Sequence, residues 1–144
     1  MIRFSFLAAA SVAGASVGLY VSPALAAEVP VHNKPALVEA IAGSSLKKVT
    51  LTPKAAERLG VQIDEVREDM SGHRIVPYTA VLYDLTGGAW VYVHSDPMAF
   101  VRQSIKIDTI KGNNVYLSDG PSLGTKVLAA AVPQVFGTEK GVGH

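Results

Sequence analysis

The chain has 144 residues, with 13 Lys and Arg against 12 Asp and Glu, and it contains no cysteine. This length suffices for one compact domain, and the near balance of charge predicts no basic patch for nucleic acid or for an anionic lipid surface. The absence of cysteine excludes disulfides, thiolate catalysis and thiolate metal ligands, so the core must hold the fold together.

The first 26 residues have the layout of a secretory signal peptide. Arg3 lies in a short, weakly positive start, residues 4–21 form a mostly apolar run, and residues 22–26 end in a small-x-small cleavage site. Cleavage after Ala26 leaves 118 residues, with twelve basic and twelve acidic side chains. The alternative is an uncleaved membrane anchor, because the apolar run is about long enough to cross a bilayer. We therefore expect export across the inner membrane to the periplasm.

Residues 27–45 are predicted as a flexible leader that includes a short helix. The beginning of this leader is polar and contains Pro30, which is typical of flexible chain. Residues 35–43 favour the helix, with Gly43 as its end, but the segment is too brief to be stable without packing on the domain.

A strand is expected over 47–51, followed by a helix of one or two turns. Thr52 is the predicted N-cap, because its hydroxyl can accept a hydrogen bond from the first helical turn. Pro53 suits the first helical position, where no N–H donor is needed. Gly60 ends the helix, since glycine readily adopts the left-handed conformation of a C-cap.

The rest of the chain alternates between short apolar runs and turns that contain Gly, Pro, Asn or Asp. The strands predicted from these runs cover 61–64, 74–83, 89–94, 101–108, 115–117 and 126–131. Their regular spacing predicts an all-β fold, mainly an antiparallel small barrel or sandwich with one or two short helices. The expected β-domain covers 46–140, and 141–144 form a tail.

One predicted hairpin carries a group of aromatic side chains. It runs through 76–93 and carries four of them: Tyr78, Tyr83, Trp90 and Tyr92. Because strand side chains alternate between faces, Trp90 and Tyr92 share a face with His94. Either one face belongs to the core and the other packs on a neighbouring loop, or the aromatic face contacts a partner protein.

Three segments, 49–61, 76–93 and 100–127, together resemble the periplasmic adaptor subunits of resistance-nodulation-division efflux pumps, the HlyD-like membrane fusion proteins. The resemblance implies the membrane-proximal β-domain of that family, which is built from the two ends of a longer chain. A full adaptor inserts a β-barrel, a lipoyl-like domain and usually an α-helical hairpin between the first and second segments. Here residues 64–74 alone occupy that gap, and a turn at 69–72 is expected to join the two ends directly.

The resemblance implies a non-enzymatic, exported interaction module that docks on an inner-membrane efflux transporter or on a full-length adaptor. It would be membrane-associated through these partners only, with no cofactor and no nucleic acid. The residues expected to contact the partner are the hairpin aromatics and the loop that follows them: Tyr78, Tyr83, Trp90, Tyr92, Pro97 and Phe100.

Two other functions remain open from the sequence. His94 and Asp96 lie two residues apart at a strand end and are weak candidates for a metal or small-ligand site. A decayed adaptor fragment that folds without a role is the other alternative. An enzyme is not expected, because the chain has no dinucleotide fingerprint and its carboxylates are scattered, without a paired arrangement that suggests acid–base catalysis.

Overall fold

The computed structural model describes residues 34–141, so the expected signal peptide over 1–26 and its cleavage lie outside the described residues. The strands are β1 (Ala36–Ala40), β2 (Lys47–Leu51), β3 (Gln62–Glu65), β4 (Arg67–Glu68), β5 (Arg74–Pro77), β6 (Leu82–Tyr83), β7 (Ala89–Ser95), β8 (Ala99–Lys111), β9 (Asn114–Asp119) and β10 (Lys126–Ala130). The helices are α1 (Pro53–Leu59), the 3-10 turn η1 (Tyr78–Ala80) and α2 (Val132–Lys140).

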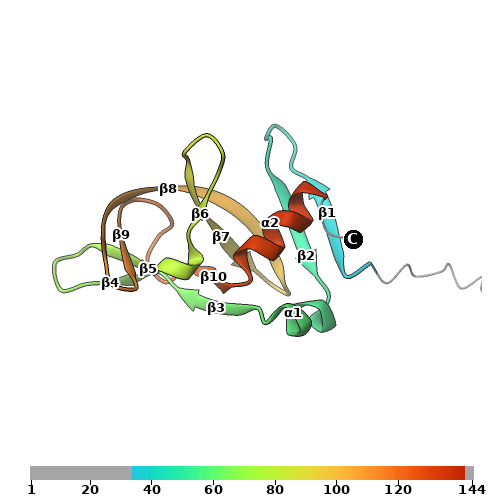
Figure 1. Ribbon diagram of the computed structural model, residues 1–144, viewed down its shortest axis with the longest axis horizontal. Coiled ribbons are helices and arrows are strands. Elements are labelled where there is room, and N and C mark those ends of the chain that lie inside the picture. Colours follow the sequence, from blue (N-terminus) through green and yellow to red (C-terminus); the bar gives the residue numbers. More distant parts are fainter. Residues whose placement is uncertain (1–33, 142–144) are drawn as a thin grey trace, which may run out of the picture. The chain divides into compact units, whose positions relative to one another are not determined.

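The strands form a mainly antiparallel, nearly closed barrel, which confirms the predicted fold class (Figure 1). The pairing order is β3-β10-β7-β8-β9-β5-β4, while β2 pairs with β8, β1 with β2, and β6 with β7. The first and last strands of this order, β3 and β4, are consecutive in the chain and separated by Val66 alone. The strand order therefore almost closes on itself. Backbone hydrogen bonds join Val66 to Thr125 and Gly124, each at 2.9 Å, where the chain bends between the two strands.

Strand β7 lies between two hydrophobic cores, because its alternate side chains point to opposite faces of the sheet. Val91 belongs to the barrel interior, together with Val76, Ile105 and Val115. Tyr92 belongs to the core on the other face, which also takes side chains from β2, α1 and α2. Both faces of this strand are therefore used, which explains why apolar and aromatic side chains alternate along it without a polar face.

Helix α1 begins and ends at the predicted residues. The Thr52 hydroxyl accepts a hydrogen bond from the Ala55 N–H at 3.2 Å, and a proline occupies the first helical turn. Gly60 adopts φ 68° and its N–H bonds back to the helix, as expected for a left-handed C-cap. Ala55 and Ala56 are the buried residues of this helix.

The short helix expected over 35–43 is instead strand β1, which pairs antiparallel with β2. Ala, Leu and Glu favour a helix on propensity, but a helix of nine residues is marginal without packing. Pairing with β2 supplies a ladder of backbone hydrogen bonds that an isolated helix in this place lacks. The turn between the two strands contains Gly43 at φ 74°, the residue expected to end the helix.

Helix α2 does not follow from the sequence patterns and covers one face of the sheet (Figure 1). Its buried residues Val132, Val135 and Glu139 repeat at helical spacing. No helix within residues 34–141 has the length and apolar character needed to cross a membrane.

The predicted strand 74–83 and the predicted turn 69–72 are found in modified form. The strand is interrupted by η1, so that β5 pairs with β9 while β6 pairs with β7. The turn joins β4 to β5, and the Asp69 carboxylate accepts hydrogen bonds from the N–H groups of Ser71 and His73, both at 2.9 Å. These bonds, that from His73 first, lower the pKa of Asp69. The two parts of the chain that flank this turn therefore close into one sheet through a short connection.

Candidate functional site

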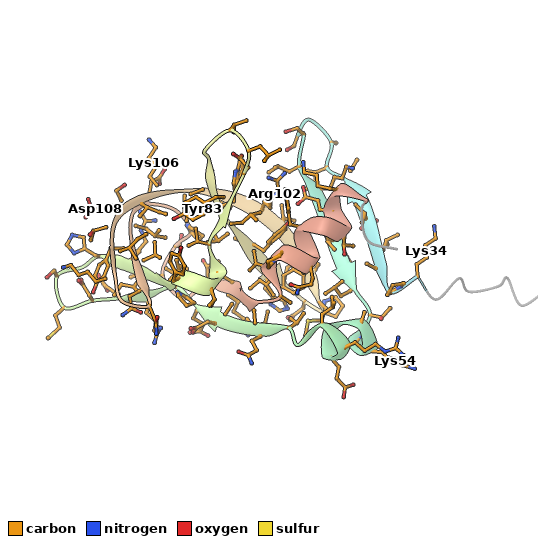
Figure 2. All side chains as sticks on the ribbon, in the orientation of Figure 1. Lys34, Lys54, Tyr83, Arg102, Lys106 and Asp108 are labelled. Carbon is orange, nitrogen blue, oxygen red and sulfur yellow. The ribbon has the colours of Figure 1, made fainter. Side chains whose placement is uncertain are left out.

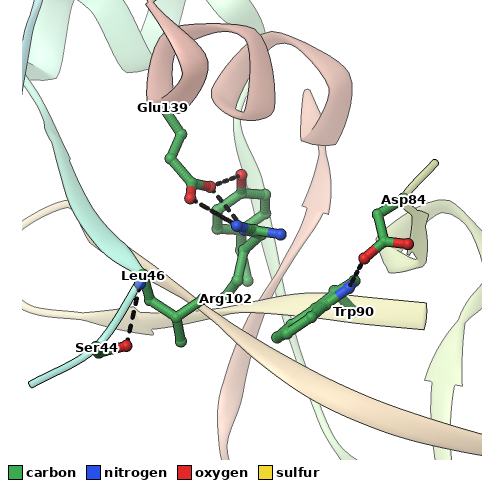
Figure 3. Close-up of polar contacts among 7 residues, drawn as sticks. Ser44, Leu46, Asp84, Trp90, Arg102 and Glu139 are labelled. Atoms are coloured by element: carbon green, nitrogen blue, oxygen red, sulfur yellow. Dashed lines mark hydrogen bonds and ion pairs between the residues drawn. The ribbon is translucent and has the colours of Figure 1, made fainter. Parts of the chain in front are cut away.

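Three side chains form a buried polar group between the sheet and α2, which we call the Arg102 cluster (Tyr92, Arg102 and Glu139). Figure 2 shows Arg102 beside α2, and the cluster is enlarged in Figure 3. The Arg102 Nε lies 2.8 Å from Glu139 Oε2, and Arg102 Nη2 donates to Glu139 Oε1 at 2.9 Å. The Tyr92 hydroxyl donates to Glu139 Oε2 at 2.6 Å. Residues from β7, β8 and α2 are thus joined through one carboxylate.

The cluster is buried, and two aromatic rings lie against its cation. The Glu139 and Arg102 side chains are 2 % and 8 % exposed. The Arg102 guanidinium lies 4.8 Å from the centre of the Trp90 ring and 5.5 Å from that of Phe136, so both rings face a cation. Burial, and then the nearby Glu139 carboxylate, raise the pKa of Tyr92, so its hydroxyl stays protonated and remains a donor. A neutralised charge pair of this kind holds α2 in one place on the sheet, which is a structural role.

The turn between β6 and β7 is organised by Asp84. Its carboxylate accepts hydrogen bonds from the Thr86 hydroxyl at 2.7 Å and from the Gly88 N–H at 2.8 Å. It also accepts one from the Trp90 indole N–H at 2.8 Å (Figure 3). These donors, Thr86 first and Trp90 second, stabilise the charged form and lower the pKa of Asp84 to about 2. Trp90 is therefore fixed between Asp84 at its indole nitrogen and Arg102 at its ring face.

We expect the Trp90 indole N–H to report the protonation of Asp84. A group with a lowered pKa stabilises the fold above its ordinary pKa of 3.8, and that contribution is lost as the pH falls through about 2. Because the chain contains one tryptophan, the indole N–H resonance in an NMR pH titration is assigned without ambiguity. The midpoint should lie near 2, and Asp84→Asn should abolish the transition. A midpoint near 4 would contradict the hydrogen-bonded arrangement.

The six residues expected to contact a partner do not share one surface. Tyr92 and Phe100 are fully buried in the core that α2 covers, and Trp90 is half-buried under Arg102. The expectation that Tyr92 and Phe100 contact a partner does not fit this burial, because neither side chain reaches solvent. The three remaining residues, Tyr78, Tyr83 and Pro97, are exposed.

Two exposed residues at the turn of the predicted hairpin form the β6–β7 turn surface, which we define as Tyr83 and Leu85. Tyr83 is about half exposed and Leu85 is fully exposed at the tip of the turn. The Asp84 carboxylate accepts hydrogen bonds from the Thr86 and Gly88 N–H groups, so this apolar tip is presented on a hydrogen-bonded turn. Leu85 is missing from the sequence-based expectation because a leucine in a turn carries no aromatic or charge signal.

His94 and Asp96, the weak candidates for a ligand site, line the same pocket of about 520 Å³. Asp64, Glu65 and Met98 also contribute to its wall. The His94 Nε2 atom is buried and has no hydrogen-bond partner among residues 34–141. No group of three or more His, Cys, Asp or Glu side chains within the described range is arranged to hold a metal ion. The lining of this pocket therefore combines one histidine and scattered carboxylates with the cations of Arg67 and Lys126.

Sequence reasoning missed the Arg102 cluster because its anionic member lies on the unforeseen helix. Positions i, i+3, i+4 and i+7 of this helix are Val132, Val135, Phe136 and Glu139. They form a stripe along one helix face that is apolar except at its last position, Glu139. That pattern is a detectable signal, but Pro133 and Gly137 within the same nine residues argue against a helix.

Comparison with known proteins identifies no relative: no family model, no curated protein and no solved structure matches the chain. The structure itself shows a small, antiparallel, barrel-like β-domain.

Proposed function

We propose that this protein is a non-enzymatic interaction module of the periplasm that docks on an inner-membrane efflux transporter or on a full-length periplasmic adaptor. The sequence resemblance to the membrane-proximal domain of HlyD-like adaptors supplies the partner class. The proposal includes export through the N-terminal apolar segment and membrane association through the partner.

One observation carries the proposal: the two parts of the chain that flank the 69–72 turn complete a single barrel. The β3 strand from the first part pairs with β10, and β5 from the second part lies between β4 and β9. In the adaptor family the corresponding ends are separated by several inserted domains, yet must still meet in one domain. The short turn fits a version of that domain which needs no insertion, because a short connection lowers the entropic cost of closure.

The β6–β7 turn surface is the contact that we assign to the partner. Leu85 and Tyr83 present apolar and aromatic area on a turn fixed by Asp84, and such preorganised groups are favoured at interfaces.

Crosslinking in cells tests this function. A photoreactive amino acid at Leu85 is expected to capture an inner-membrane transporter or a full-length adaptor, identified by mass spectrometry. The same group at Asp108, on β8, is the matched control and should capture neither; Figure 2 shows Asp108 and Tyr83 at separate positions. Failure to recover a transporter or adaptor from either position in native membranes would overturn the proposal.

Binding of a small ligand is a second candidate. It is favoured by the pocket that His94 and Asp96 both line, and by the buried His94 Nε2, which has no hydrogen-bond partner among residues 34–141. A specific ligand stabilises the protein that binds it by mass action. A thermal melt with excess zinc, copper or silver should show a rise in Tm that His94→Ala abolishes. No rise with any of these ions would exclude the metal version of this function.

A further inference from the structure

Strand β1 is an open edge of the sheet within the described part of the chain, and its outward backbone groups follow from its register. Thr52 N–H donates to the Pro35 carbonyl at 3.0 Å, and Ile41 N–H donates to the Leu46 carbonyl at 3.3 Å. In an antiparallel ladder, the N–H and C=O groups of every second residue face the partner strand. The two bonds above therefore mean that the odd-numbered residues of β1 bond to β2. The residues whose N–H and C=O groups point away from β2 are Ala36, Val38 and Ala40.

Nothing within β1 blocks addition of another strand to this edge. Proline commonly protects an edge by removing a donor. Pro35, however, is an odd-numbered residue, so its missing N–H lies on the side that faces β2. The side chains of Leu37 and Val38 are 56 % and 37 % exposed, so apolar area is available beside the free backbone groups.

A groove lies along the start of β1, against α1 and the end of α2. It has a volume of about 540 Å³ and is lined by residues 34–38, by Leu51 of β2, by Ala55, Arg58 and Leu59 of α1, and by Thr138 of α2. A second hollow of about 440 Å³ shares Pro35, Ala55 and Arg58 with its lining.

The groove is strongly one-sided in charge. Its two hollows are lined by Lys34, Lys54 and Arg58 and by no acidic residue. None of these three cations forms an ion pair within residues 34–141. Figure 2 shows Lys34 and Lys54 at the same end of the domain, far from Lys106. An occupant of this groove is therefore expected to carry negative charge at the Lys34 end of β1.

We propose that β1 accepts an extended polypeptide segment of a partner protein as an additional antiparallel strand, with acidic residues at the carboxyl end of that segment. Antiparallel pairing is the more stable arrangement per residue. Because Lys34 precedes β1, this pairing places the carboxyl end of the added strand beside Lys34. Its backbone pairs with Ala36, Val38 and Ala40, and its carboxylates meet the three cations. Its alternate side chains lie over Leu37 on one face of the sheet and over Val38 on the other. This contact is separate from the β6–β7 turn surface and does not require the partner to be a transporter or an adaptor.

The first test titrates the full chain with three synthetic peptides while recording backbone amide resonances. The probe is acetyl-Thr-Val-Thr-Val-Thr-Asp-Asp amide; its controls place the two Asp residues first or replace them with Lys. The acidic-end peptide should shift the amide resonances of Ala36, Val38 and Ala40 and bind about tenfold more tightly than either control. Its affinity should fall as salt is added. Equal binding of all three peptides, or none, would overturn the proposal.

Matched variants separate the backbone contact from the charge contact. Val38→Pro removes one outward N–H but no bond to β2, and should weaken peptide binding about tenfold, whereas Val38→Thr should not. Lys34→Glu and Arg58→Glu should each weaken binding about threefold or more, whereas Lys106→Glu, an equal change of charge at a distant site, should leave it unchanged. Unshifted amide resonances of β2 would show that the variants remain folded.

Other occupants of the groove give different results, each of which contradicts the proposal. Amides of Ala36, Val38 and Ala40 that are already protected from hydrogen exchange in the free chain would mean that its own residues cover the edge. Self-association in sedimentation, lost in Val38→Pro, would mean a second copy. Amide shifts with laurate but not with the peptide would mean a lipid-type anion.

The proposed function and this inference fail independently. If crosslinking through Leu85 captures a transporter or adaptor even with Val38→Pro, and no peptide binds, the proposed strand addition is wrong. The proposed function is then still supported. Peptide binding without such a captured partner keeps the added strand and removes the function.

Discussion

Replacing Glu139 with alanine is expected to lower the free energy of unfolding by about 3–5 kcal/mol, the usual result of removing one member of a buried charge pair. The substitution leaves the Arg102 guanidinium buried without its carboxylate and leaves the Tyr92 hydroxyl without an acceptor. Urea unfolding followed by the fluorescence of Trp90 measures the loss, because the ring of Trp90 lies against Arg102.

A triple variant shows how much of that loss comes from the stranded charge. Arg102→Met, Glu139→Leu and Tyr92→Phe together remove every polar group of the Arg102 cluster and keep its volume approximately. Buried ion pairs replaced by apolar groups are often neutral or stabilising, so this variant should regain most of the stability that Glu139→Ala loses. A loss below about 1 kcal/mol for Glu139→Ala alone would mean that water reaches the carboxylate.

The Arg102 cluster also specifies where α2 lies, since an apolar helix face tolerates small shifts that a bidentate charge pair does not. Val132 and Val135 of α2 are apolar, and among residues 34–141 it is Glu139 that links this helix to two strands through directional bonds. We therefore expect the triple variant, although stable, to show broader amide resonances in α2 than the natural chain. Equally sharp resonances would show that packing alone positions the helix.

Local signals predicted the parts of this fold that are stabilised locally. Thr52, Pro53 and Gly60 define α1 through bonds within the helix and its caps, which do not depend on the rest of the molecule. The turns and most strands were likewise predictable from Gly, Pro, Asn and Asp between β-branched runs. Residues 35–43 were not, because their helix-favouring composition is overridden by pairing with β2.

The candidate site was less predictable, because burial depends on what covers each face of the sheet. The alternation along β7 correctly placed Trp90 and Tyr92 on one face. That face is buried because α2 covers it. Helix α2 was not predicted, because Pro133 and Gly137 argue against a helix in the sequence. A proline in the first turn needs no N–H donor, and the cost of the glycine is outweighed by packing of the helix on the core.

Phe100 provides the sharpest distinction between a core residue and a partner-contact residue. Its ring is fully buried, lies 5.4 Å from the ring of His94 and stands opposite Val49 in the β2–β8 pairing. Phe100→Ala is therefore expected to cost about 3–5 kcal/mol of unfolding free energy, as is usual when a buried ring is removed from a core. Urea unfolding measures this loss, and Phe100→Leu, which keeps most of the volume, should recover more than half of it.

Tyr83→Ala is the matched experiment at an exposed aromatic residue. Tyr83 is about half exposed on a turn that Asp84 holds without it, so its removal should change stability by no more than about 0.5 kcal/mol. If the β6–β7 turn surface contacts a partner, the same substitution should reduce crosslinking from Leu85 while the protein remains folded. The opposite pattern, a stable Phe100→Ala protein that loses its partner, would mean that the loop after β7 opens and exposes the ring on binding. Phe100 is therefore expected to contribute to the free energy of folding, and Tyr83 to contact with a partner.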